Sequence, residues 1–225
     1  MRLIDSHSHL FLEEFAGDLP QVMARAREAG VTHIFMPNID STTIKPMLRV
    51  CREYKGYCYP MIGLHPTSVD ADYEKELDIV ARELASSNEF VAVGEIGMDL
   101  YWDKTFLREQ QRALGRQIEW ALEYSLPVVL HCREAFDHIY NVLKPYQQTP
   151  LKGIFHSFTG DLGRGLQDYG ICGFYDRNKW CGDFQEINFA RSLEEYSFGT
   201  YRAGNRFPLS DSGSQSRQEE RNRIC

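Results

Sequence analysis

The sequence lacks the features that mark membrane proteins, secreted disulfide-rich proteins and zinc knuckles. No apolar run approaches the roughly 18 residues that a membrane helix needs, and the N-terminal residues MRLIDSHSHL hold no apolar signal core. The 6 cysteines form no CxxC pair, which argues against a disulfide framework or a structural zinc knuckle. We therefore interpret them as reduced, mostly buried thiols. The protein is expected to be cytoplasmic, with no membrane association and no implied protein partner.

An excess of positive charge is also missing. The 225 residues carry 25 Lys and Arg against 32 Asp and Glu, a net charge of −7. This balance excludes a broad basic face that coats nucleic acid or an anionic membrane, while local contacts to a phosphate stay open. The length and the 43 % hydrophobic residues suit one globular domain with a sizeable core.

Aliphatic residues become scarce after residue 160. Val, Ile, Leu and Met number 42 in residues 1–160 but 7 in residues 161–225, where valine is absent. The second part carries 8 Arg and 1 Lys and ends in SDSGSQSRQEERNRIC, which holds too few apolar residues for a core. We therefore divide the chain into a folded domain, residues 1–160, and a poorly structured, irregular tail, residues 161–225.

Six short apolar runs alternate with amphipathic segments in the first part. The runs are LIDSHSH, VTHIFMPNI, YCYPMIGLH, EFVAVGEIG, LPVVLHC and KGIFHSF. The segments between them repeat apolar residues every three or four positions, which predicts helices, and the alternation predicts parallel strands with right-handed crossovers. A doubly wound sheet would carry a Gly-rich phosphate turn after its first strand, and none is present. We predict an α/β fold of the TIM (β/α)8 type that is incomplete, since six strands are legible.

Polar side chains close five of the six runs. They are His7 and His9, His65, Glu95, His131 and His156. Because active sites of parallel barrels lie at the carboxyl ends of the strands, these side chains are expected to gather at one mouth. His7 and His9 stand two apart on a strand, so both imidazoles can face one metal ion. Such ligands suit divalent Zn, Mn or Mg that activates water, and a bridging carboxylate allows two ions.

Five segments resemble, in order and spacing, the TatD family of metal-dependent deoxyribonucleases. They are DSHSHL (5–10), IGLHP (62–66), VAVGEIGMD (91–99), PVVLHCREA (127–135) and HSFTG (156–160). The resemblance implies a TIM barrel, related to the amidohydrolases, that hydrolyses phosphodiester bonds with divalent ions. The ligands that it implies are His7, His9, Glu95, His131 and His156, and Glu95 is also the expected catalytic residue. His65 and Arg133 match positions near the substrate phosphate, which a guanidinium can hold with two donors.

Four further residues lie near these motifs, and three of them have more than one interpretation. Asp99 either orients a ligand or is an ordinary solvated carboxylate, and it is left out of the ligand set. Tyr101 and Trp102 either stack on a nucleobase or cap the barrel. Cys132 lies between His131 and Arg133 and is expected to point the opposite way, into the helix layer.

The tail departs from the family pattern. The resemblance implies a seventh strand and an eighth that ends in a metal-site Asp within a motif like ETDSPYL. If the tail is back-translated and read one base later, residues 176–184 permit IGINGVVTF and residues 204–209 permit ETDSP. We interpret residues 161–225 as an out-of-frame product of a one-base loss after codon 160. Without this Asp, we expect weak metal binding and little nuclease activity.

Three functions remain in view. The favoured one is a divalent-metal phosphodiesterase that removes nucleotides from DNA ends or single-stranded DNA. A catalytically inactive relic that still binds metal is the second, and the missing Asp favours it for this chain. An amidohydrolase that acts on C–N bonds is the third, although Glu95, where many of those enzymes have a carbamylated lysine, and Arg133 count against it.

Overall fold

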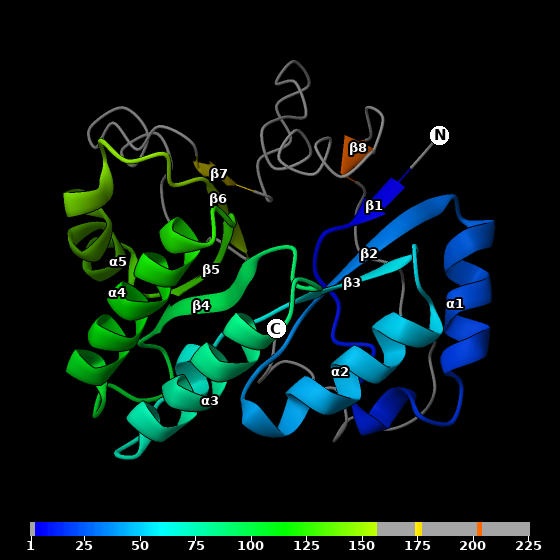
Figure 1. Cartoon of the computed structure of the whole chain (residues 1–225), viewed down its shortest axis with the longest axis horizontal. Coiled ribbons are helices and arrows are strands. Elements are labelled where there is room, and N and C mark those ends of the chain that lie inside the picture. The colour runs from blue at the N-terminus through cyan, green and yellow to red at the C-terminus, as the bar shows by residue number, and fades with distance from the viewer. Residues whose placement is uncertain (1–2, 157–173, 177–201, 204–225) are drawn as a thin grey trace.

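The computed structural model describes residues 3–156, 174–176 and 202–203. Strands and helices alternate along this part of the chain, and the helices lie on the outer side of the strands (Figure 1). The strands are β1 (Leu3–Asp5), β2 (Val31–Pro37), β3 (Cys58–Met61), β4 (Val93–Asp99), β5 (Val128–Arg133), β6 (Gly153–His156), β7 (Phe174–Asp176) and β8 (Arg202–Ala203). The helices are α1 (Leu19–Glu28), α2 (Ser41–Glu53), α3 (Tyr73–Ser86), α4 (Leu107–Glu123) and α5 (Phe136–Leu143), with 3-10 turns η1 (Glu13–Phe15), η2 (Pro66–Ser68) and η3 (Lys144–Tyr146).

Helix α2 shows how local sequence sets these elements. It begins at a capping box, in which Asp40 Oδ1 accepts the Thr42 N–H at 2.9 Å and Thr43 Oγ1 accepts the Asp40 N–H at 3.1 Å. Its buried face repeats at intervals of three and four residues, as the sequence predicted. The buried residues are Ile44, Met47, Leu48, Val50 and Cys51.

The strands pair in parallel and follow one another in chain order. One sheet has the order β3-β2-β1-β8 and the other the order β4-β5-β6-β7. A parallel bridge between Ile62 and Val93 joins β3 to β4 across the two sheets. The succession from β8 through β1 to β7 is that of a (β/α)8 barrel, which confirms the predicted fold class.

Strands β2 to β6 are largely buried on both faces, as parallel strands between helices must be. The smaller of two apolar clusters takes Phe35 from β2, Met61 from β3, Val129 from β5 and Ile154 from β6. Such a layer of strand residues is what fills the interior of a barrel. The larger cluster joins the strands to the surrounding helices and includes Cys132, which therefore packs in the helix layer as expected.

Two short strands were not predicted from the sequence, which showed six. The three residues of β7 pair with β6, and the two residues of β8 pair with β1. The physical reason is that the open edges of β1 and β6 present unpaired backbone groups, which an extended segment of almost any composition can bind. The rest of residues 157–225, with most of the segments that the shifted frame restores, lies outside the described residues.

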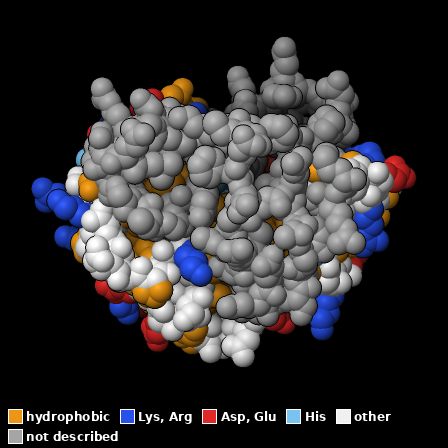
Figure 2. All heavy atoms as spheres, turned by 90° about the horizontal axis from the view of Figure 1, so that it is seen from above, with side chains coloured by type: hydrophobic (Ala, Val, Ile, Leu, Met, Phe, Trp, Pro, Cys, Tyr) orange, Lys and Arg blue, Asp and Glu red, His pale blue; other side chains and the backbone are white. Residues whose placement is uncertain are grey.

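No helix in the described ranges combines the length and the apolar character that crossing a bilayer requires. Around the rim of the face drawn in Figure 2, Lys and Arg side chains alternate with Asp and Glu side chains. This mixture agrees with the net charge of −7.

Candidate metal centre

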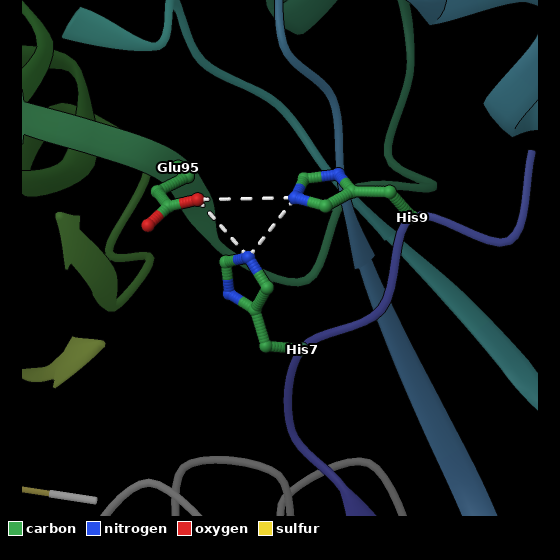
Figure 3. Close-up of side chains that lie close together, drawn as sticks. All are labelled: His7, His9 and Glu95. Atoms are coloured by element: carbon green, nitrogen blue, oxygen red, sulfur yellow. Dashed lines mark hydrogen bonds and ion pairs between the residues drawn. The ribbon is translucent and has the colours of Figure 1, made fainter. Parts of the chain in front are cut away.

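The candidate centre is built around Glu95, which lies inside β4 and is fully buried. Figure 3 shows the imidazoles of His7 and His9 pointing toward its carboxylate. The sequence predicted both histidines on a strand, but β1 ends at Asp5 and they follow it. The Asp5 carboxylate accepts the backbone N–H of His7 at 3.1 Å, which fixes the segment that carries both rings.

One carboxylate oxygen faces both of these histidines. Glu95 Oε2 lies 3.0 Å from His7 Nε2 and 3.9 Å from His9 Nε2. The two imidazole nitrogens lie 3.1 Å from each other. His7, His9 and Glu95 therefore form one group whose ligand atoms lie close enough to share an ion.

A second group shares the same glutamate. Glu95 Oε2 lies 3.5 Å from His65 Nε2, and Glu95 Oε1 lies 3.2 Å from His131 Nδ1. His65 comes from the segment after β3 and His131 from β5. The sequence assigned His65 to the substrate phosphate, whereas the structure brings it into a group of three candidate ligands.

Asp99 extends this cluster and was not included in the predicted ligand set. It is the last residue of β4, is 3 % exposed, and places Oδ2 2.9 Å from His131 Nε2. The alternative of a solvated loop carboxylate is therefore wrong. Strand alternation puts residues 95, 97 and 99 on one face, and this is the signal that could have joined Asp99 to Glu95.

The other two predicted residues lie beside the cluster. His156 ends β6 and stacks on His7 with 3.6 Å between ring centroids and 7° between planes. It belongs to neither of the two groups of close ligand atoms. Arg133 ends β5, and its guanidinium packs over the Tyr101 ring.

Neighbouring groups fix which nitrogen of two imidazoles carries the proton. His9 Nδ1 lies 3.0 Å from the carbonyl oxygen of Pro37 and donates to it, so a neutral ring has its lone pair on Nε2. His65 Nδ1 instead accepts the backbone N–H of Thr67 at 3.2 Å, which places the proton of the neutral ring on Nε2. His9 is therefore arranged as a ligand, and His65 as a hydrogen-bond donor.

Burial and charge set the protonation states of the centre. Burial lowers the pKa of His9 to about 3, assisted by His7, and lowers the pKa of His65 to about 3. Burial alone would raise the pKa of Glu95, but His7 and His156 hold it well below its usual value. At neutral pH His9 and His65 are therefore neutral and Glu95 is ionised, the states that a metal ion requires of its ligands.

His131 is the exception among the histidines. Burial would lower its pKa, but its hydrogen bonds to Asp99 and Glu95 raise it to about 9. The same contact holds the pKa of Asp99 below its usual value, against the effect of burial. Two carboxylates thus favour a positive charge at this point, and a divalent cation carries such a charge.

The close contacts of Glu95 Oε2 are not hydrogen bonds. Glu95 Oε2 and His65 Nε2 are buried, and neither has a hydrogen-bond partner in the part of the chain that the structure describes. Two ligands on one tetrahedral zinc ion stand about 3.4 Å apart, which resembles the 3.0–3.9 Å separations between Glu95, His7 and His9. The residues fit a divalent metal ion that would supply the missing partner.

Comparison with known proteins identifies the family of the chain. The chain matches the family model described as TatD related DNase over residues 4–167. It is 36 % identical over 159 residues to an uncharacterized metal-dependent hydrolase, YabD, of Bacillus subtilis, covering 70 % of this chain and 61 % of the relative. It is 35 % identical over 158 residues to the 3'-5' ssDNA/RNA exonuclease TatD of a Pantoea species, covering 70 % and 60 %.

Solved structures of TatD proteins have a fold similar to that of this chain. The crystal structure of YjjV, a TatD homolog from Escherichia coli, superimposes with a TM-score of 0.70 at 31 % identity, covering 78 % of this chain and 67 % of that one. A TatD family hydrolase from Entamoeba histolytica, at 22 % identity and a TM-score of 0.63, shares the fold. The chain spans about 60 % of the length of the curated relatives that it matches. With the family model matched over most of its length, the chain belongs to the TatD related DNases.

Proposed function

We propose that this chain is a divalent-metal-dependent hydrolase of phosphodiester bonds that acts on the ends of single-stranded nucleic acid. The observation that carries the proposal is the convergence of four histidines on one buried carboxylate, Glu95, which has no hydrogen-bond partner for Oε2 among the described residues. The substrate is suggested by the name of the Pantoea relative, a 3'-5' ssDNA/RNA exonuclease.

The two groups around Glu95 suit two ions that share its carboxylate. His7 and His9 would hold the first ion with Glu95, and His131 would hold the second, with Asp99 Oδ2 2.9 Å from its Nε2 to orient the ring. His156, which stacks on His7, stays a proposed ligand. When bound, such ions polarise a phosphoryl oxygen and lower the pKa of water, whose proton a carboxylate such as Glu95 can take.

Two side chains are proposed to hold the substrate phosphate. His65 directs its Nε2 proton into the centre, because Nδ1 already accepts the Thr67 N–H. Arg133 follows His131 by two residues on β5, so both lie on the same face of the strand. Its guanidinium can hold two phosphate oxygens in one plane.

We also propose that this particular chain has a low rate. The family's eighth-strand Asp, which is expected to bind metal and help deprotonate water, is not legible in the tail, and the loss of such a residue typically lowers a rate by roughly 10²–10⁴. Residues 1–160 are the proposed catalytic domain and residues 161–225 the proposed out-of-frame tail. The three described cysteines are free and buried, which suits the proposed cytoplasmic location.

The proposal is tested by metal-dependent nucleotide release. The full chain is incubated with Mn²⁺ and a short single-stranded DNA, and released nucleotides are measured against a control with EDTA. Glu95→Gln should abolish release, whereas Glu89→Gln, at an exposed carboxylate paired with Arg52, should leave it unchanged. Metal binding without release would indicate the inactive relic. Turnover of amides or lactones in place of DNA would indicate an amidohydrolase.

A further inference from the structure

Two large aromatic side chains are exposed beside the candidate metal centre. Tyr101 is 49 % exposed and Trp102 is 56 % exposed, and they directly follow β4. Their ring centroids lie 4.7 Å apart with the rings nearly perpendicular. With Tyr124 they are the large hydrophobic side chains that stand exposed in the described part of the chain, so capping of the core does not account for this pair.

The aromatic pair is bonded to the centre through one carboxylate. The backbone N–H of Tyr101 donates to Asp99 Oδ1 at 3.0 Å, while Asp99 Oδ2 lies 2.9 Å from His131 Nε2. A single side chain therefore links the first aromatic residue to a candidate metal ligand. The backbone at the start of the pair is thereby fixed relative to Asp99 and His131.

Arg133 connects the pair to the proposed phosphate contact. Its guanidinium carbon lies 4.0 Å from the centroid of the Tyr101 ring and 5.1 Å from that of Trp102. Arg133 also stands opposite Asp99 in the register of β4 and β5. Such cation–π contacts occupy the face of the guanidinium, and its N–H groups point outward in its plane, where they can bind phosphate oxygens.

We propose that Tyr101 and Trp102 form a stacking surface for an unpaired nucleobase, next to the phosphate that Arg133 binds. This inference rests on the proposed function and adds to it a subsite that contacts the base. Aromatic rings stack on any base, because every base has a π-face. In a duplex the base faces are covered by neighbouring pairs, so this surface selects single strands or frayed ends over paired DNA.

The test measures binding separately from hydrolysis. The full chain with Mn²⁺ is titrated into a fluorescent six-nucleotide single-stranded DNA whose phosphorothioate linkages resist cleavage. A second oligonucleotide is identical except that its sugars carry no bases. The wild-type chain should bind the complete oligonucleotide about tenfold more tightly than the abasic one, the size expected for one stacked base.

Variants assign this difference to the aromatic pair. Trp102→Leu should weaken binding of the complete oligonucleotide about tenfold and leave the abasic one unchanged, while Trp102→Phe should keep most of the preference. Tyr124→Leu is the matched control, since Tyr124 is 40 % exposed and directly follows α4, ahead of β5. Circular dichroism verifies that each variant is folded.

Two outcomes would overturn the inference. One is equal affinity of the wild-type chain for both oligonucleotides, which needs no variant. The other is an equal loss for both oligonucleotides in Trp102→Leu, which would mean that the pair only positions Arg133. Failure of the proposed function is a separate result, because it appears as absent nucleotide release from an unmodified strand whatever the base preference in binding.

Discussion

Gln110 and Asp99 exchange two hydrogen bonds, as residues of neighbouring strands do. The Asp99 N–H donates to Gln110 Oε1 at 2.9 Å, and Gln110 Nε2 donates to the Asp99 carbonyl at 3.2 Å. Gln117 lies seven residues further along the same face of α4. Its Oε1 accepts the Leu64 N–H at 2.6 Å, and its Nε2 donates to the Leu64 carbonyl oxygen at 3.3 Å. Helix α4 therefore fixes Asp99 and the residue that precedes His65.

Replacing Gln110 by Met should destabilise the chain and weaken metal binding. Met keeps the size of the side chain but leaves the buried N–H and C=O of Asp99 without partners, at a cost of about 2 kcal/mol or more. The free energy of unfolding is measured in urea, and Mn²⁺ affinity is measured by calorimetry. Gln111→Met is the control, because Gln111 has a long 3.4 Å contact with His138. Equal stability of the two variants would contradict the prediction.

Two glycine-to-alanine changes should have opposite effects. Gly97 has a φ of 139°, and a Cβ there would stand 2.1 Å from the carbonyl oxygen of His131. Gly97→Ala must move β4 away from His131, so we expect a loss of several kcal/mol in stability, or failure to fold. Gly115 lies inside α4 with Val142 Cγ1 at 3.9 Å. Gly115→Ala should raise stability by about 0.5–1 kcal/mol, measured in urea.

The metal-free chain should be most stable near pH 6.5. Unfolded histidines titrate near 6.5, while folded His9 and His65 have pKa values of about 3. Below pH 6.5 these two histidines are protonated in the unfolded chain but not in the folded chain. The free energy of unfolding therefore falls by up to about 1.4 kcal/mol per pH unit for each of them as the pH decreases. His131 has its pKa raised to about 9, and its contribution is instead lost as the pH rises from 6.5 through 9. The free energy of unfolding of the EDTA-treated chain, measured in urea at pH 5, 6.5 and 9, checks the expected loss on both sides of pH 6.5. Constant stability across this range would be the contrary result.

The described cysteines should resist alkylation in the folded chain. Burial raises the pKa of Cys58 and Cys132 to about 12 and raises that of Cys51 as well. Because the thiolate is the reactive form, iodoacetamide at pH 8 should label these three residues only after denaturation. Peptide mass spectrometry measures the labelling. Rapid modification of Cys132 in the native chain would show that it does not pack in the helix layer.

Sequencing the gene across codons 150–170 should restore one base. The restored frame would supply the seventh strand and the Asp of the eighth, and the corrected protein should release nucleotides roughly 10²–10⁴ times faster. Nucleotide release by the two proteins on the same single-stranded DNA gives the ratio. An unchanged frame, or equal rates, would be evidence against this interpretation of the tail.

The sequence predicts the barrel fold and most of the cluster because both depend on regular periodicity. Apolar runs separated by helical segments predicted the first six strands. The histidines at the ends of those runs identified five of the residues near Glu95. The sequence left two interpretations of Asp99 open because β4 continues past Glu95 to residue 99, beyond the apolar run that was taken as the strand.

Other features depend on contacts that periodicity does not encode. Gln110 occupies the apolar stripe of α4, and the sequence alone does not indicate that it bonds the backbone of Asp99. The role of His65 is a second such feature, because it depends on which ring nitrogen accepts the Thr67 N–H. The strands β7 and β8 formed where the sequence has few apolar residues, because backbone pairing at a sheet edge needs little from side chains.

The centre draws its residues from both sheets of the chain. His7, His9 and His65 follow strands of one sheet, while Glu95 and His131 belong to the other, and Ile62 and Val93 provide the bridge between them among the described residues. An ion bound by both groups would act as a cross-link between the two sheets. Metal affinity then depends on how the two sheets are aligned. A substitution far from the centre that shifts one sheet would therefore first weaken ion binding.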